Sequence, residues 1–253
     1  MKPDYRLILA IVLFSVILLA SITLNFHLFN RGQQYYLQLN ETRLDPLGLS
    51  YYSSVPDQQG LISPERVTVV LFGDSRAAAW PAPPNLSEFE FVNRGIGAQT
   101  SAQCAQRFDD HVSPLHPQIV IVQVGINDLK TIPLFPERKE VIIARCKENI
   151  QEIAERSTAL GATVILTTIF PIGQVPLERR PFWSNDVALA IDEVNAHISS
   201  LQSENIIVFD SYSILADSKG LVRPEYSQDF LHINAKGYEA LNHELTHVLA
   251  AWE

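Results

Sequence analysis

Three side chains in this sequence could together hydrolyse an ester. Ser75 comes directly after the apolar run 67–72, and Asp229 and His232 stand three residues apart before the last predicted helix. A serine hydroxyl is a weak nucleophile until an imidazole accepts its proton, and a carboxylate on the other ring nitrogen fixes the tautomer of that imidazole. These residue types predict Ser75 as nucleophile, His232 as base and Asp229 as the group that orients the base.

Hydrogen-bond donors for the same reaction could come from two other segments. Attack on an ester carbonyl places a negative charge on its oxygen, and donors that are already in place must stabilise that charge. Asn127 lies after the apolar run 119–124, and Ala98 follows a run at 89–92. We expect the side-chain amide of Asn127 and the backbone amides of Ser75 and Ala98 to form this oxyanion hole.

Short β-branched runs alternate with longer amphipathic stretches from residue 65 onward. Asn234 is placed to cap the last stretch, and Gly161 is placed to end the first. We predict strands at 67–72, 89–92, 119–124, 163–169 and 206–209, and helices at 137–160, 186–201 and 235–249. The alternation indicates an α/β domain of three αβα layers with a mostly parallel five-stranded sheet. Right-handed crossovers would bring the carboxyl ends of all five strands to one edge.

Each of these segments also has a simpler explanation when it is taken alone. Gly, Asp and Ser favour turns for backbone reasons, and Asn127 could only cap a helix. A lone histidine such as His232 is more often a hydrogen-bonded structural residue than a base. Four unrelated turns would not be expected to supply nucleophile, donor, acid and base along one sheet edge, so the set favours an active site.

The order of four short motifs resembles one family of enzymes. Gly-Asp-Ser at 73–75 is followed by Asn-Arg-Gly-Ile-Gly at 93–97, Gly-Ile-Asn-Asp at 125–128 and Asp-x-x-His at 229–232. This order resembles the SGNH hydrolases, also called GDSL-type esterases and lipases, over roughly residues 67–250. The resemblance implies a flavodoxin-like fold with strand order 2-1-3-4-5. It also implies hydrolysis of esters or thioesters without a metal or other cofactor.

The resemblance places the family's functional residues on the positions already singled out. The nucleophile falls on Ser75, the oxyanion asparagine on Asn127, and the acid and base on Asp229 and His232. One position departs, because the family's oxyanion glycine falls on Ala98. Alanine can supply the same backbone N–H if its φ is negative, whereas a positive φ would strain it.

The N-terminal part of the chain is predicted to anchor it in a membrane. Residues 7–29 are apolar and carry no formal charge, and at about 1.5 Å per residue they would cross the roughly 30 Å hydrocarbon core of a bilayer. A cleaved signal peptide is the alternative, but this run is longer than the usual signal and lacks a good cleavage site. Lys2 and Arg6 weakly favour a cytoplasmic N-terminus, which would place the catalytic domain outside the cytoplasm, on the periplasmic or cell-surface side.

The predicted division of the chain has four parts. A short tail at 1–6 and a single-pass transmembrane anchor at 7–29 precede a spacer at 30–64 and a hydrolase domain at 65–253. The spacer contains Gly and Pro among polar residues and shows no sustained helical or strand period, although its tyrosine pairs suggest that part of it packs on the domain.

Composition limits the class of protein further. The chain has 253 residues, of which 47% are hydrophobic, so it can form one domain with a substantial core plus an appendage. Its formal net charge is −9, and no basic stretch is longer than Arg179-Arg180. Nucleic-acid binding depends on clustered Lys and Arg, so we expect no nucleic-acid partner.

Other motifs and the two cysteines allow more than one interpretation. Gly95-Ile96-Gly97 lacks the third glycine of a dinucleotide fingerprint and follows the second strand. The segment 243–247 matches the zinc motif H-E-x-x-H, but little chain follows it to supply a third ligand, so we expect no metal there. Cys104 and Cys146 could form a disulfide outside the cytoplasm or remain buried thiols, and the sequence leaves both open.

The sequence therefore predicts a membrane-anchored serine esterase. Loops 129–137 and 171–184 carry aromatic and proline residues and should form the rim of the cleft. The location favours a small-molecule, glycan or lipid ester as substrate, such as the O-acetyl groups of envelope glycans. Two alternatives remain: an O-acyltransferase that passes the acyl group to an envelope glycan, and a catalytically silent SGNH-like binding module.

Overall fold

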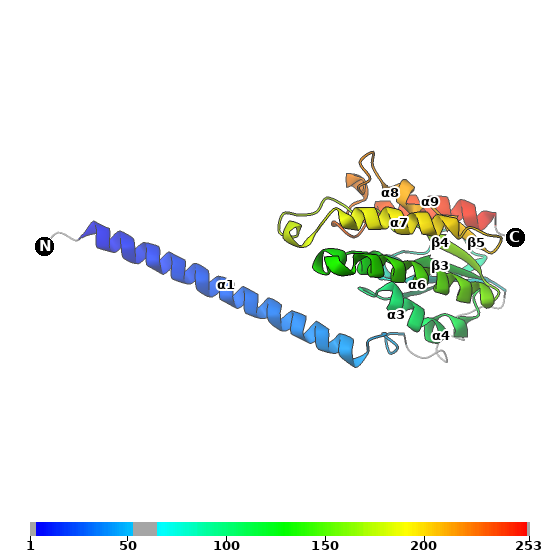
Figure 1. The fold of residues 1–253 in the computed structure, drawn as a ribbon, viewed down its shortest axis with the longest axis horizontal. Helices are drawn as coiled ribbons and strands as arrows, with labels where there is room; N and C mark the ends of the chain where they lie inside the picture. The colour runs from blue at the N-terminus through cyan, green and yellow to red at the C-terminus, as the bar shows by residue number, and fades with distance from the viewer. Residues whose placement is uncertain (1–3, 53–64, 252–253) are drawn as a thin grey trace. The chain divides into compact units, whose positions relative to one another are not determined.

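The computed structural model describes residues 4–52 and 65–251, and the chain divides into two compact units. One unit contains the N-terminal helix, and the other begins at Leu47 and contains all the remaining helices and strands of the described chain (Figure 1). Residues 53–64 of the predicted spacer lie outside the described part.

The first unit is a single helix, α1 (Tyr5–Leu44), with no buried residue. The apolar run 7–29 lies within it, and the helix is long and apolar enough by length and composition to cross a membrane. The helix continues through residues 30–44, so the expectation that the spacer has no helical order was wrong for that part. Gln, Leu, Glu and Arg dominate this stretch and are good helix formers, and the helix ends just before Pro46, which disfavours helical backbone in the preceding residue.

The second unit is built on a parallel sheet of five strands in the order β2-β1-β3-β4-β5, which confirms the predicted order. The strands are β1 (Val67–Gly73), β2 (Phe89–Gly95), β3 (Ile119–Gln123), β4 (Thr163–Thr167) and β5 (Ile206–Phe209). Strand β2 is longer than predicted because the polar residues Asn93 and Arg94 keep the parallel register with β1. Strand β4 is shorter than predicted because the Ile169 amide donates to the side chain of Asn195 instead of to a neighbouring strand.

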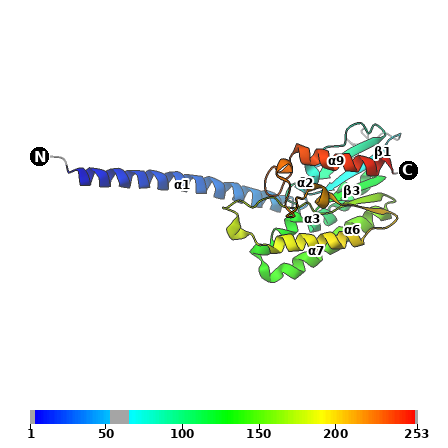
Figure 2. The ribbon, with the colours of Figure 1, turned by 90° about the horizontal axis from the view of Figure 1, so that it is seen from above.

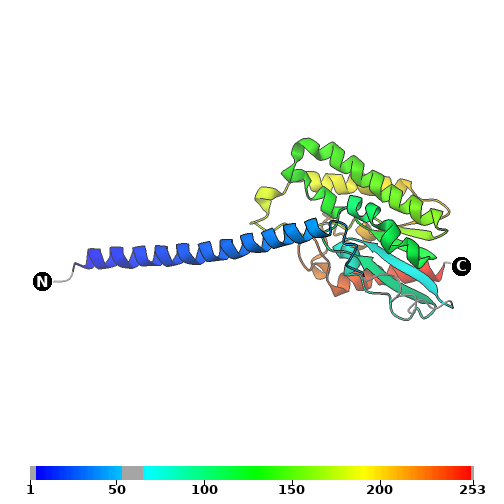
Figure 3. The same cartoon turned by 90° about the horizontal axis from the view of Figure 1, so that it is seen from below.

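Helices cover both faces of this sheet and give three layers, as Figures 2 and 3 show from opposite sides. Alternate strand residues face two separate cores, so that Val70 and Val120 pack under α6 and α7 while Val69 and Ile119 pack under α9. The α-helices are α2 (Ser75–Ala78), α3 (Ser101–Gln106), α4 (Phe108–His111), α5 (Ile126–Leu129), α6 (Lys139–Ala159), α7 (Asp186–Ser200), α8 (Ser211–Leu215) and α9 (Ala235–Ala250). Short 3-10 turns are η2 (Ser113–Leu115), η3 (Ile132–Leu134), η4 (Pro136–Arg138), η5 (Arg180–Phe182) and η6 (Pro224–Tyr226).

The predicted helix ends are present. Gly161 follows α6 with a φ of +84°, in the left-handed region that favours glycine. The Asn234 side chain accepts a hydrogen bond from the Gly237 amide at 3.2 Å and caps α9. The long helix predicted at 137–160 begins two residues later because η4 occupies its expected first turn.

The last described residues of the predicted spacer pack on the second unit. The Gln99 side chain donates to the Leu47 carbonyl at 2.7 Å, and the Tyr52 hydroxyl donates to the Gly95 carbonyl at 2.5 Å. The guanidinium of Arg94 also lies over the Tyr52 ring. Residues 47–52 therefore support the loop that follows β2, at the carboxyl edge of the sheet.

Candidate active site

The turn after β1 presents Ser75 at the carboxyl edge of the sheet. Gly73 has a φ of +150°, and a Cβ at this position would lie 1.8 Å from the Gln123 carbonyl oxygen, so only glycine fits. Asp74 then accepts a hydrogen bond from the Arg76 amide at 2.8 Å and caps the short helix α2. Ser75 is the first residue of that helix and is half-buried.

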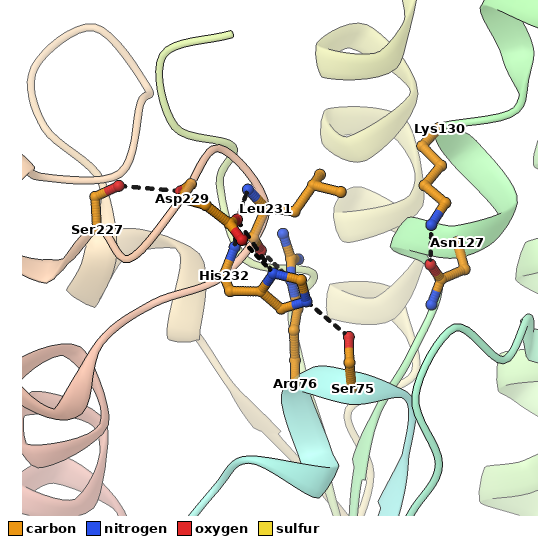
Figure 4. A network of polar contacts seen from close by, with 8 residues as sticks. All are labelled: Ser75, Arg76, Asn127, Lys130, Ser227, Asp229, Leu231 and His232. Atoms are coloured by element: carbon orange, nitrogen blue, oxygen red, sulfur yellow. Dashed lines mark hydrogen bonds and ion pairs between the residues drawn. The ribbon is translucent and has the colours of Figure 1, made fainter. Parts of the chain in front are cut away.

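The loop before α9 brings His232 and Asp229 to this serine (Figure 4). The Oγ of Ser75 lies 3.0 Å from the Nε2 of His232. On the other side of the ring, Nδ1 lies 2.9 Å from the Oδ2 of Asp229. The structure thus places the three predicted residues in one hydrogen-bonded chain, with the hydroxyl, imidazole and carboxylate in the order that proton transfer requires.

The Asp229 carboxylate is held by its own loop. Its Oδ1 accepts hydrogen bonds from the backbone amides of Leu231 at 2.7 Å and His232 at 2.8 Å. Partial burial raises the pKa of this carboxyl, but the hydrogen bonds from the His232 side chain and from the two amides outweigh burial and lower the pKa below its usual value. Asp229 is therefore ionised at neutral pH and can keep the Nδ1 proton of His232 in place.

Arg76 joins the serine turn to the histidine loop, and sequence reasoning did not single it out. Its side chain is fully buried, and its Nε donates to the Leu231 carbonyl at 2.9 Å while its Nη1 donates to the Phe170 carbonyl at 3.2 Å. The only signal in the sequence was its position directly after the Gly-Asp-Ser motif. A charged side chain buried at that position needs hydrogen-bond partners, because burying an unpaired charge is costly. Burial lowers the pKa of Arg76, and the neighbouring Asp74 carboxyl opposes that effect.

Asn127 lies in the short helix that follows β3, with its side chain pointing toward the same edge (Figure 4). It is 5% exposed and lies in α5, one residue after Ile126 and two after Gly125, whose φ is +124°. Its Nδ2 donates to the Gln99 carbonyl at 2.9 Å, and its Oδ1 accepts from the Lys130 ammonium at 2.5 Å. One hydrogen of the Nδ2 group remains available to a bound oxygen.

Ala98 does not meet the condition set for it. Its φ is +63°, in the left-handed region, so of the two cases foreseen for Ala98 the strained one applies. The cost for a residue with a Cβ is roughly 1 kcal/mol. The loop holds this conformation because the next side chain, Gln99, is fixed by the Leu47 carbonyl and by the guanidinium of Arg107. Within the described chain, no group accepts a hydrogen bond from the amides of Ala98 or Ser75.

The predicted rim loop after β4 lies against the histidine loop. The Gly173 amide donates to the Phe230 carbonyl at 2.9 Å, and the rings of Trp183 and Phe230 meet edge to face at 5.3 Å. A cavity of about 310 Å³ lies beside this contact and is lined in part by Gly173, Arg180 and Trp183. A larger hollow of about 940 Å³ lies elsewhere, between β5 and α9, and includes none of the predicted site residues.

The H-E-x-x-H segment lies on α9, where His243, Glu244 and His247 line the larger hollow. His243 and His247 are exposed, and their rings meet edge to face at 5.0 Å. Among residues 4–52 and 65–251, no three potential metal ligands cluster. Cys104 and Cys146 are buried free thiols, and burial raises the pKa of the Cys104 thiol to about 12.

Comparison with known proteins agrees with this fold. Residues 66–240 match the model of the GDSL-like lipase/acylhydrolase family. Comparison with curated proteins found no match.

Solved structures with the same fold include a GDSL-like lipase and two esterases. The chain is similar to a GDSL-like lipase from Bacteroides thetaiotaomicron, with a TM-score of 0.62, 23% identity and coverage of 81% of this chain and 98% of that one. It is also similar to the acetyl xylan esterase AlAXEase, with a TM-score of 0.55, 17% identity and coverage of 72% and 100%. A third similar structure is a variant of Axe2, an acetyl-xylooligosaccharide esterase from Geobacillus. Its TM-score is 0.53 at 18% identity, and the match covers 76% of this chain and 96% of that one. At these identities the likeness concerns the fold.

Proposed function

Because the chain belongs to the GDSL-like lipase/acylhydrolase family, we propose that it is a serine esterase that hydrolyses carboxylic esters through an acyl-enzyme on Ser75. The observation that carries this proposal is the hydrogen-bonded chain from Ser75 through His232 to Asp229, at 3.0 Å and 2.9 Å. Such a chain activates a hydroxyl at neutral pH without a metal or another cofactor.

In the first half of the proposed reaction, the Ser75 Oγ attacks the ester carbonyl carbon. The Nε2 of His232 accepts the hydroxyl proton, and Asp229 stabilises the imidazolium that forms. The negative charge on the former carbonyl oxygen is met by the backbone amides of Ser75 and Ala98 and by the Nδ2 group of Asn127. His232 then gives its proton to the leaving alcohol, and the carbon–oxygen bond of the ester breaks.

In the second half, water attacks the acyl carbon of the Ser75 ester. His232 takes a proton from that water and returns it to the Ser75 oxygen as the carboxylic acid leaves. The His232 side chain is 36% exposed, so an acceptor can approach it from solvent. A sugar hydroxyl could approach His232 in the same way as water. Attack by that hydroxyl on the acyl-enzyme would transfer the acyl group to the sugar, which is the O-acyltransferase alternative.

For substrate and location, we propose that helix α1 anchors the chain in a membrane as a single pass, with the catalytic unit outside the cytoplasm. Its uncharged run 7–29 and the positive charges of Lys2 and Arg6 before it support this arrangement. Esters of the cell envelope are then the accessible substrates: O-acetyl groups on glycans, or lipid esters. Two solved structures of the same fold are esterases of acetylated sugars, so glycan O-acetyl esters are the first substrates to test.

Labelling by a fluorophosphonate tests the central step. This reagent forms a bond with an activated serine, so the full chain in detergent should be labelled while Ser75→Ala and His232→Ala should not. The absence of label on the wild-type chain, in protein shown to be folded, would favour the silent binding module. Analysis of products from an acetylated donor with a glycan acceptor separates hydrolysis, which releases free acetate, from acyl transfer.

A further inference from the structure

Lys130 lies beside the proposed oxyanion hole and contacts it through Asn127 (Figure 4). It follows α5 directly, is half-buried, and donates from Nζ to the Oδ1 of Asn127 at 2.5 Å. Neither the sequence motifs nor the proposed reaction assigns a role to this lysine.

The contact determines which way the Asn127 amide points. The two ends of an asparagine amide have nearly the same shape, so hydrogen-bond partners decide the orientation. An ammonium group can only donate, and the Gln99 carbonyl can only accept. The Oδ1 of Asn127 must therefore face Lys130 and its Nδ2 must face Gln99, which leaves the second Nδ2 hydrogen for the oxyanion. If Lys130 were apolar, the amide would have one fixed partner instead of two.

The positive charge of Lys130 also acts on the amide electrostatically. Within the described chain, Lys130 forms no ion pair with a carboxylate, so its charge is not neutralised by direct contact. A cation on the Oδ1 side polarises the amide and makes its N–H groups stronger donors, because hydrogen bonds to charged groups strengthen their neighbours. The effect is largest in a buried site, and Asn127 is 5% exposed.

From this geometry we propose that Lys130 is a positioning residue of the oxyanion hole, which fixes the Asn127 amide and strengthens its donor hydrogen for the transition state. This inference rests on the proposed esterase function. This positioning role differs from a role in which Lys130 binds an anionic group of the substrate. In that second case, replacing Lys130 would slow the hydrolysis of charged esters only.

Four charged groups face Lys130 and set the pH range in which it is protonated. Burial lowers its pKa, the carboxyls of Asp74 and Asp128 raise it, and the guanidinium groups of Arg76 and Arg179 lower it further, so that the pKa lies below the usual lysine value. The wild-type rate should therefore fall on the alkaline side, as Lys130 loses its proton, at a pH below the ordinary range for lysine.

The test uses the full chain in detergent with p-nitrophenyl acetate, a neutral ester, and compares Lys130→Met with Lys130→Arg. We expect Lys130→Met to lower kcat by about tenfold with little change in KM, less than the loss of a direct oxyanion donor. Lys130→Arg should retain most of the rate, and its alkaline fall should disappear because arginine keeps its proton. Lys147→Met is the matched control, since Lys147 is also partly buried but pairs with Glu193. That variant should behave as wild type, and thermal melting should show that all the variants are folded.

Three results would overturn the inference: an unchanged kcat in folded Lys130→Met, the same alkaline fall in Lys130→Arg, or a loss confined to KM for anionic esters. Failure of the proposed function is distinguishable from these results. In that case the wild-type chain itself would neither hydrolyse the ester nor react with a fluorophosphonate.

Discussion

The serine turn and the histidine loop serve the same proposed reaction in opposite environments. On the serine turn, the polar side chains of Asp74 and Arg76 are fully buried. On the histidine loop, the side chain of Asp229 is 48% exposed and that of His232 is 36% exposed. One half of the site is thus built into the core, and the other half lies at the surface.

This difference shows two ways to hold a reactive group. The serine turn is fixed by tight backbone packing, because a Cβ at Gly73 would clash with β3. The histidine loop is fixed by local hydrogen bonds from its own amides to Asp229. Arg76 links the two, since it belongs to the turn and donates to the Leu231 carbonyl of the loop.

The largest expected effect on activity comes from the exposed half, when the Asp229 carboxylate is replaced by a neutral amide. Asp229→Asn keeps its oxygen as the acceptor for the loop amides, which turns its NH2 group toward the Nδ1 of His232. This favours the tautomer with its proton on Nε2, which cannot accept the proton of Ser75, so we expect kcat to fall by about a thousandfold. Steady-state kinetics with p-nitrophenyl acetate measures this, and circular dichroism checks the fold. A loss of less than tenfold would show that Asp229 does not orient the base.

In the buried half, replacing Asp74 should change the free energy of unfolding and its dependence on pH. Burial raises the pKa of Asp74 to about 6, although the Arg76 charge and amide oppose the shift. Below pH 3.8 the group is neutral in both the folded and unfolded states, and stability is lost as pH rises toward the folded pKa. Asp74→Asn avoids this cost, so its free energy of unfolding should exceed the wild-type value by up to about 3 kcal/mol above pH 6.

Urea unfolding of both chains between pH 3.5 and 8 measures this difference. The advantage of Asp74→Asn should be smallest near pH 4 and reach its plateau above pH 6. A constant difference across the whole range would mean that Asp74 does not titrate in this window.

The link between the halves should have a smaller effect on activity. Arg76→Leu removes the donors to the Leu231 and Phe170 carbonyls, so the histidine loop loses a contact without losing a reacting group. We expect kcat to fall by about tenfold, which is about 1.4 kcal/mol in activation free energy. Amide hydrogen exchange of residues 227–232 should become faster while exchange in β1 stays slow. Equal acceleration in both segments would indicate general unfolding instead of release of the loop.

The smallest expected effect is a change in stability from the loop after β2, which belongs to neither the serine turn nor the histidine loop. Ala98→Gly relieves the strain of a φ of +63° and should raise the free energy of unfolding by about 0.5 to 1 kcal/mol, with activity changed by less than about twofold. Ala79→Gly is the matched control, because Ala79 is exposed with a φ of −85°, and glycine there should be destabilising. Thermal melts should show opposite signs for the two variants; the same sign would mean that Ala98 is not strained.

Much of the sheet could be predicted because its signals are local. The runs of β1 and β3 are apolar on both faces, as buried parallel strands require. The predicted ends of β1, β3 and β5 agree with the structure within one residue. Strand β2 was predicted too short because the sequence shows Asn93 and Arg94 as polar residues, whereas pairing with β1 keeps them in the ladder. Helix α1 was predicted too short because a mixed polar stretch shows no single apolar face.

The sequence by itself determined the residue types after each predicted strand and the uncharged N-terminal run, because each depends on neighbours in the chain. The strand order followed from the family that its four motifs resemble. Only the tertiary structure decided the left-handed backbone of Ala98, the buried link through Arg76 and the contact of Lys130 with Asn127. The first arises from how Gln99 is held by residues far away in the sequence, and the second joins residues 76 and 231. Lys130 and Asn127 are close in sequence, but the orientation of the Asn127 amide also depends on the Gln99 carbonyl, which accepts from its Nδ2 and comes from a separate loop. Contacts of this kind depend on how separate loops meet in space, and the pattern of residues along one segment does not contain that information.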